Sequence, residues 1–318
     1  MLQNAKRTGM GLIDNVKATM KSQETEGPFE LYVTRTPGYL WALLFKKLHI
    51  HPVAVTIVSI VIGAAAGYFF YSNDIRQNLI GMALLIWANW FDCADGQLAR
   101  MTGKRTLIGR ILDGFCGDVW FFFIYLFISL RLREELIPFT NIEWGVIIFL
   151  LCAWAGIKCH GRQCAIGDYF RNIHMYFQFG AEKSELDSSD KVREEMKSLK
   201  WNRQGWFQKL YLYFYARYTG SQEDQVKNFH KMMLFLREKY GDNIPEELRN
   251  DFLAGSRPLM PLSNILTFDF RVIIMFLCIG FDLPWLYVVL ECTLFEILRF
   301  YTIARHEKVC AQIIKKYA

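Results

Sequence analysis

Four aspartates lie in a short stretch of the chain whose surroundings are strongly apolar. They are Asp92, Asp95, Asp113 and Asp118. An unpaired carboxylate at membrane depth costs several kcal/mol, so a partner must offset that cost. On a helix, which turns about 100° per residue, Asp92 and Asp95 project from neighbouring positions on one face. We therefore expect these two carboxylates to share a cation.

A second helical segment supplies the other two carboxylates. Asp113 and Asp118 follow a polar, basic link, MTGKRT, that separates the two segments. Oxygen ligands of this kind suit Mg²⁺ or Mn²⁺, which commonly share their remaining coordination positions with substrate phosphates. The pattern predicts a cavity in which two metal ions neutralise a diphosphate while a remaining carboxylate accepts a proton from an attacking hydroxyl.

Small and basic residues accompany the first aspartate pair. Gly96 removes a side chain next to the carboxylates, and Ala99 keeps the following turn of that face small. Arg100 supplies hydrogen-bond donors for phosphate oxygens. We expect these residues, together with Asp92, to shape a site for a nucleotide diphosphate.

The composition is that of a membrane protein with a substantial polar part. Of the 318 residues, 53% are hydrophobic and 16% aromatic, and the mean hydropathy is +0.13. The net charge of +6 is spread along the chain without a nucleic-acid motif, which favours membrane lipids over nucleic acid as partners. The eight cysteines are predicted to be free thiols, because nearly all of them fall within or beside apolar segments.

Six segments have the length and apolarity expected of membrane helices. They lie near residues 53–71, 78–90, 111–130, 144–158, 265–281 and 283–301. The first thirty residues lack a signal peptide, and basic residues gather on the side of the N-terminus. We therefore expect an all-α integral protein of the inner (cytoplasmic) membrane with six transmembrane helices and an active site that faces the cytoplasm.

Polar segments divide the chain into four predicted parts. Residues 1–50 form a cytoplasmic N-terminus with an amphipathic helix near 35–50 that lies on the inner leaflet, or alternatively packs on protein. Residues 51–174 hold the first four spans and the acidic motif. A helical, membrane-apposed cytoplasmic insert is predicted at 175–258, and the last two spans with a basic tail at 259–318.

The acidic stretch closely resembles the signature of the CDP-alcohol phosphotransferase family, which reads D-x-x-D-G-x-x-A-R, then eight residues, then G-x-x-x-D-x-x-x-D. The chain matches, with the eight-residue gap intact, at Asp92, Asp95, Gly96, Ala99, Arg100, Gly109 and Asp113. The resemblance covers roughly residues 30–170. It implies a nucleotide and metal site at these positions, six membrane helices with an N-terminal interfacial helix, and a homodimer.

The last aspartate of the signature is displaced in this chain. In the family it serves as general base and metal neighbour; its position holds Gly117 here, and Asp118 follows one residue later. A straight helix turns Asp118 about 100° away from the expected direction. We expect a one-residue bulge, eased by Gly114 and Gly117, to re-aim Asp118 as base or fourth ligand. Otherwise the base is missing, and Asp118 is a structural partner for an arginine.

A second group of polar residues lies in and after other spans. Lys158, His160 and Arg162 weakly resemble the basic stretch of family members that act on phosphorylated alcohols, and are predicted to bind an acceptor or lipid phosphate. Inner-leaflet snorkelling is the alternative. In the last span, the spacing of Glu296 and Arg299 permits either a structural ion pair or a role in the cavity.

The leading hypothesis is metal-dependent transfer of a phospho-alcohol, such as a phosphatidyl group, from a CDP-alcohol to a hydroxyl acceptor with release of CMP. We favour CDP-diacylglycerol with inositol or inositol phosphate, because Lys158 and Arg162 would accommodate a phosphate. The alternatives are a CDP-choline or CDP-ethanolamine transferase acting on a lipid hydroxyl, a sphingolipid included, and a catalytically inactive relative that binds nucleotide or lipid. A transporter, motivated by Glu291 and Glu296, is a third possibility.

Overall fold

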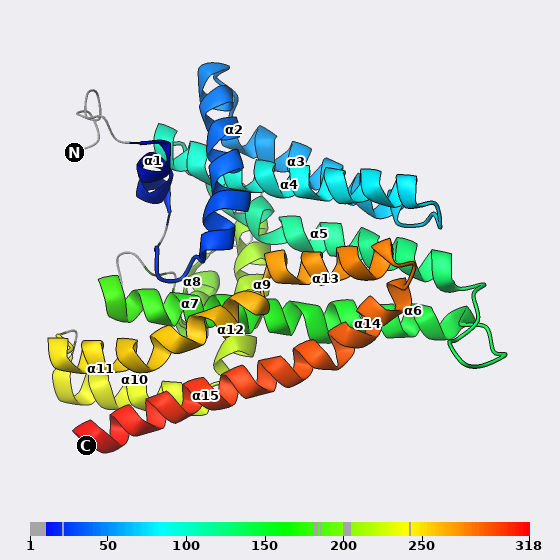
Figure 1. The fold of residues 1–318 in the computed structure, drawn as a ribbon. Helices are drawn as coiled ribbons and strands as arrows, with labels where there is room; N and C mark the ends of the chain where they lie inside the picture. The colour runs from blue at the N-terminus through cyan, green and yellow to red at the C-terminus, as the bar shows by residue number, and fades with distance from the viewer. Residues whose placement is uncertain (1–10, 21, 181–183, 185, 200–204, 242) are drawn as a thin grey trace. The chain divides into compact units, whose positions relative to one another are not determined.

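Helices make up the regular structure of the computed structural model, which describes residues 11–20, 22–180, 184, 186–199, 205–241 and 243–318 (Figure 1). Within these ranges no strand is present, so the all-α class is confirmed. The chain divides into two compact units, Met1–Phe127 and Ile128–Ala318.

The first unit carries the acidic motif. Its elements are α1 (Leu12–Thr19), η1 (Glu30–Arg35), α2 (Thr36–Lys47), α3 (Pro52–Phe69), α4 (Ile75–Thr102) and α5 (Leu107–Leu132), the last of which continues into the second unit. Capping residues determine where α3 and α4 begin. The His51 ring accepts the backbone N–H of Val53, and the Asp74 carboxylate accepts that of Arg76. Figure 1 shows α3 and α4 running side by side.

A buried indole joins α3 to α5. Trp120 is 2% exposed, and its Nε1 donates to the backbone oxygen of Ser59 at 3.1 Å. The Ser59 hydroxyl in turn donates to the Ala88 oxygen of α4 at 2.7 Å. Gly63 makes room for the ring, because a Cβ placed there would lie 2.2 Å from two of its atoms. These contacts hold the three helices in the order that brings their polar ends together.

We expect Gly63→Ala to destabilise the protein by about 1–3 kcal/mol, because the added methyl group overlaps a ring that has no space to move. Gly114→Ala is the matched control. A Cβ on Gly114 meets no described atom within 4 Å, and alanine stabilises a helix relative to glycine. Thermal unfolding of both variants in detergent checks the prediction, and an equal midpoint for the two would contradict it.

The second unit is built from shorter helices. After the end of α5 it contains α6 (Gly145–Trp154), η2 (Ala155–His160), α7 (Gly161–Phe179), α8 (Ser189–Ser198), α9 (Trp206–Glu223), α10 (Lys227–Tyr240), α11 (Glu246–Ser256), η3 (Arg257–Leu259), α12 (Met260–Ile265), α13 (Phe268–Gly280), α14 (Pro284–Cys292) and α15 (Leu294–Tyr317). Both η1 and η2 are turns of π-helix, a form that is frequent at functional sites.

The helices predicted as a separate insert share a core with their neighbours. Phe170 and Phe177 of α7, Met232 of α10, Phe252 of α11 and Phe295 of α15 belong to one buried apolar cluster. Figure 1 shows α10 and α11 lying along α15. The region 175–258 therefore packs into the second unit through α10 and α11, which the polar character of its sequence had not predicted.

Four helical segments are long and apolar enough to cross a membrane. They are Pro52–Phe69, Ile108–Leu132, Gly145–Phe179 and Glu246–Gly280, and they overlap the first, third, fourth and fifth predicted spans. These segments indicate an integral membrane protein.

Among the described helices, those at the predicted spans near residues 78–90 and 283–301 do not have the length and apolarity needed to cross a membrane. Asn78, Asn89 and the aspartates of the motif lower the hydropathy of α4. The last predicted span is divided at Thr293, where the backbone (φ −119°, ψ −75°) separates α14 from α15. Six transmembrane helices therefore remain a prediction.

Candidate active site

Asp92, Asp95 and Asp113 come together where α4 ends and α5 begins. One carboxylate oxygen from each residue lies within 4.8 Å of the others. Asp95 is 4% exposed, Asp92 is partly buried, and Asp113 is open to solvent. The group thus opens to solvent on one side and is enclosed on the other, as a substrate site requires.

The link between the helices explains the convergence. Gly103 ends α4 in the left-handed conformation (φ +69°), which glycine adopts without strain. The Thr106 hydroxyl then accepts the backbone N–H of Gly109 at 3.0 Å and caps the start of α5. A tight, capped turn of this kind places the first turns of α5 against the last turns of α4.

The donor atoms of the group fit a divalent cation. Three carboxylates at this separation repel one another unless a positive charge lies among them. Asp92 Oδ1 and Asp95 Oδ2 are buried and have no hydrogen-bond partner among the described residues, although buried polar atoms nearly always have one. Carboxylate oxygens are also the ligands that Mg²⁺ and Mn²⁺ prefer. The three carboxylates could therefore hold a hard cation.

Neutral groups line the enclosed side of the site. The Thr56 hydroxyl of α3 lies against Asp95, and the Cys116 thiol of α5 lies against Asp92. The Cys116 sulfur also lies 3.7 Å from the Ser59 hydroxyl. These groups add no charge, so they do not replace a cation.

The phosphate-binding residues predicted on α4 border the carboxylates. A Cβ on Gly96 would have the Arg100 guanidinium as its nearest neighbour, at 3.5 Å, so glycine leaves room for a ligand beside that guanidinium. Arg100 Nε is buried without a hydrogen-bond partner among the described residues. Ala99 is partly exposed on the same face. An open face with an available guanidinium beside a cation site can accept a phosphate group.

Asp118 lies outside the group of three carboxylates. The described part of α5 is one continuous α-helix from Leu107 to Leu132, so the expected bulge is not present. Five residues along a regular helix turn Asp118 about 140° from the direction of Asp113. The prediction that a bulge re-aims Asp118 is therefore not met by this backbone.

Two residues beside the site were not predicted from the sequence. Arg35 of η1 lies close enough to Asp92 for their charges to interact. Gln97 of α4 is 1% exposed and donates to the Arg35 carbonyl at 3.1 Å. Gln97 occupies a variable position of the signature, and Arg35 is far from the motif in sequence, so no spacing rule connects them. The sequence signal for Arg35 was its place at the start of the amphipathic segment predicted before the first span.

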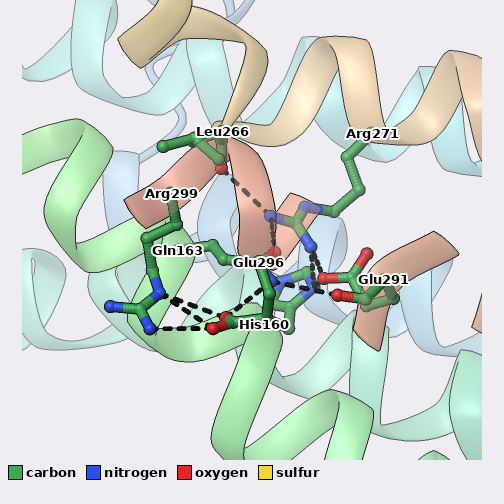
Figure 2. A network of polar contacts seen from close by, with 7 residues as sticks. All are labelled: His160, Gln163, Leu266, Arg271, Glu291, Glu296 and Arg299. Atoms are coloured by element: carbon green, nitrogen blue, oxygen red, sulfur yellow. Dashed lines mark hydrogen bonds and ion pairs between the residues drawn. The ribbon is translucent and has the colours of Figure 1, made fainter. Parts of the chain in front are cut away.

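The predicted acceptor residues lie in the second unit. Lys158 and Arg162 are exposed, whereas His160 is 6% exposed. The His160 ring Nδ1 lies 3.0 Å from the Arg271 guanidinium and 3.7 Å from Glu291, as Figure 2 shows. The imidazole is thus engaged inside the unit, and the two exposed cations are the ones available to an anionic ligand.

Arg271 and Glu291 are fully buried and form an ion pair. Gln163 connects this pair to the next: its oxygen accepts from Arg271 at 3.0 Å, and its nitrogen donates to Glu296 at 2.9 Å (Figure 2). Arg299 donates to Glu296 through both Nε and a terminal nitrogen, at 3.1 and 2.7 Å. Arg271 thus neutralises Glu291, and Arg299 neutralises Glu296. This pairing supports a structural role for the two glutamates, which had been the reason to consider a transporter.

Comparison with known proteins agrees with the geometry of the first unit. A family model described as CDP-alcohol phosphatidyltransferase matches residues 49–161. No curated protein and no solved structure matches the chain significantly. The matched range contains all three clustered aspartates, and the family is one of generally divalent-metal-dependent transferases that use CDP-alcohol donors and hydroxyl acceptors. Residues 49–161 of this chain therefore match the model of a CDP-alcohol phosphatidyltransferase domain.

Proposed function

We propose that the protein transfers a phospho-alcohol group from a CDP-alcohol to a hydroxyl acceptor and releases CMP, with a divalent metal, Mg²⁺ or Mn²⁺, bound by Asp92, Asp95 and Asp113. The convergence of these three carboxylates within 4.8 Å carries the proposal. Their position inside the domain matched by the family model supports it. A second ion, for a two-metal site, would find its remaining ligands on the substrate phosphates.

The side chains around the carboxylates have distinct tasks in this reaction. When bound, the metal ions would neutralise the diphosphate and stabilise the leaving CMP. Arg100 donates hydrogen bonds to phosphate oxygens, and Gly96 leaves space for the nucleotide beside that guanidinium. Ala99 keeps the same face of α4 small, whereas Gly109 allows close packing of α5, because a Cβ there would lie 3.0 Å from the Thr106 hydroxyl and 3.4 Å from Val53. The acceptor oxygen forms a bond to the β-phosphorus, the bond from that phosphorus to the bridging oxygen breaks, and CMP departs with the electron pair.

We propose that Asp113, the solvent-facing carboxylate of the three, accepts the proton of the acceptor hydroxyl. Asp118→Asn is therefore expected to lower the rate of CMP release less than about tenfold. Asp113→Asn should lower it by about 10³-fold, because base and metal ligand are lost together. Initial rates of both variants at saturating metal check this. A loss in Asp118→Asn as large as that in Asp113→Asn would identify Asp118 as the base and require α5 to rearrange.

The donor we favour is CDP-diacylglycerol, and the acceptor we favour is inositol or inositol phosphate. Lys158 and Arg162 are exposed cations within or just after the π-helical turn η2, and they suit an acceptor or lipid phosphate. CDP-choline or CDP-ethanolamine acting on a lipid hydroxyl is the alternative. Purified protein is offered each pair of substrates with Mg²⁺, and CMP and the lipid product are measured. CMP release that depends on one alcohol identifies the acceptor, and lipid analysis separates the two donor classes.

A binding protein without transferase activity is the second candidate function. Glycine at position 117, with Asp118 outside the carboxylate group, favours it. In that case CDP would bind in a metal-dependent manner while none of the substrate pairs yields CMP. The same preparation therefore distinguishes the two functions.

For the membrane arrangement we propose six transmembrane helices with both ends and the active site on the cytoplasmic side of the inner membrane, and a homodimer as the assembly. Four apolar helical segments support membrane insertion. Leu40, Leu43, Leu44 and Leu48 of the α2 region are exposed, which supports its placement as an interfacial helix on the inner leaflet. Accessibility of cysteines introduced at each loop tests the orientation.

A further inference from the structure

The segment before the first span is held against the motif helix by its backbone. The Trp90 indole of α4 donates to the Val33 carbonyl at 2.9 Å, and Gln97 donates to the Arg35 carbonyl at 3.1 Å. Both acceptors belong to η1, whose π-helical turn leaves such carbonyls available to side chains. These two bonds fix where the Arg35 side chain starts relative to α4.

The Arg35 guanidinium is engaged by a carboxylate from the same segment. Arg35 Nε lies 2.7 Å from Glu26 Oε2, and the two side chains are 23% and 4% exposed. Burial by itself would lower the pKa of Arg35, but the neighbouring Cys93, Glu26 and Glu30 raise it above its usual value. Arg35 therefore carries a full positive charge beside the site, and Glu26 is its anionic partner.

A second guanidinium lies beside the first. Arg35 and Arg100 are close enough to repel each other, and Arg35 is also within electrostatic range of Asp92. Arg100 Nε has no hydrogen-bond partner among the described residues, although it is buried. At Arg100 the positive charge of Arg35 has a larger effect than the negative charge of Glu26. Planar forks of N–H donors suit phosphate oxygens.

We propose that Arg35 and Arg100 together hold a phosphate group of the nucleotide donor, and that Glu26 occupies Arg35 until that phosphate replaces it. The inference rests on the proposed function and adds a residue from outside the motif to its binding site. Glu26 acts as an internal competitor: its carboxylate stands in for the phosphate when the donor is absent.

The surroundings of Glu26 allow it to leave. Glu26 lines a cavity of about 200 Å³ together with Lys17 of α1. The cavity provides space for the carboxylate, and Lys17 provides a second cation for it to face. When Glu26 moves away from Arg35, its negative charge is therefore not left buried without a counter-ion.

Isothermal titration of CDP into the purified full-length protein, in detergent with Mg²⁺, tests the inference. Arg35→Gln is expected to weaken CDP binding about tenfold, the usual effect of losing one charge-assisted contact to phosphate. Glu26→Gln is expected to tighten CDP binding several-fold, because the competitor has lost its charge. Glu26→Gln combined with Arg35→Gln should bind much like Arg35→Gln alone, since the ion pair of Glu26 is with Arg35, whereas its charge acts on Arg100 through space. Lys47→Gln removes an exposed positive charge from α2 and serves as the matched control.

Each outcome separates this inference from the proposed function. A tightening in Glu26→Gln cannot come from misfolding, so it supports the inference even where Arg35→Gln folds poorly. Unchanged CDP binding in Arg35→Gln, or a loss in Glu26→Gln equal to that in Arg35→Gln, overturns the inference. The ion pair of Arg35 and Glu26 then has a structural role. If the unaltered protein fails to bind CDP, the proposed function falls as well.

Discussion

Asparagine in place of Asp92, Asp95 or Asp113 is expected to lower the rate of CMP release by about 10³-fold. Each change removes one charged ligand from a group whose oxygens lie within 4.8 Å of one another, and a bound metal supplies several kcal/mol of stabilisation to a reacting phosphate. The thermal stability of the metal-free protein should rise rather than fall, because the repulsion among three carboxylates is relieved. Initial rates and unfolding midpoints of the three variants check both effects.

The control for these variants is Glu134→Gln, which neutralises a carboxylate that is 75% exposed. It should leave the rate unchanged. A chelator should abolish CMP release from the unaltered protein, and added Mg²⁺ or Mn²⁺ should restore it. Full activity in any of the three asparagine variants, or in excess chelator, would remove the metal site from the mechanism.

Arg271→Met is expected to destabilise the second unit by about 3–5 kcal/mol, which corresponds to a fall of roughly 10 °C in the unfolding midpoint. Arg271 and Glu291 are both fully buried. Removal of the guanidinium leaves the Glu291 charge without its counter-ion, and also removes the bond from Arg271 to Gln163. The buried cysteines, such as Cys278 and Cys310, allow unfolding to be followed with a thiol-reactive dye.

Two further variants identify the cause of the loss. Arg271→Met with Glu291→Leu removes both charges and should recover much of the stability, because an uncompensated buried charge is costlier than an apolar pair. Arg193→Met breaks an exposed pair with Asp190, whose side chains are 51% and 82% exposed, and should cost less than about 1 kcal/mol. An equal midpoint for Arg271→Met and Arg193→Met would show that the buried ion pair contributes no more to stability than the exposed one.

Much of the candidate site could be predicted because it depends on local spacing. Asp92 and Asp95 are three residues apart, so one helical turn places them together whatever the rest of the fold does. The position of Asp118 could not be predicted in the same way. Glycines permit a bulge but do not impose one, and α5 continues through Gly114 and Gly117 as a regular helix.

The roles of the basic residues after the fourth predicted span depended on the directions of their side chains. Lys158, His160 and Arg162 look alike as a basic cluster in the sequence. In the structure His160 turns inward to Arg271 and Glu291, whereas the other two residues remain exposed. Burial of the imidazole follows from contacts with α13 and α14, which lie more than a hundred residues further along the chain.

The membrane character, the all-helical class and the spacing of Asp92, Asp95 and Asp113 follow from the amino-acid order alone, because apolar length and helical period are properties of neighbouring residues. The place of Asp118 outside the carboxylate group, and the approach of Arg35 to within electrostatic range of Asp92, follow from the three-dimensional packing. Both outcomes depend on the phase of one helix against another and on contacts between distant segments, and no local pattern encodes either.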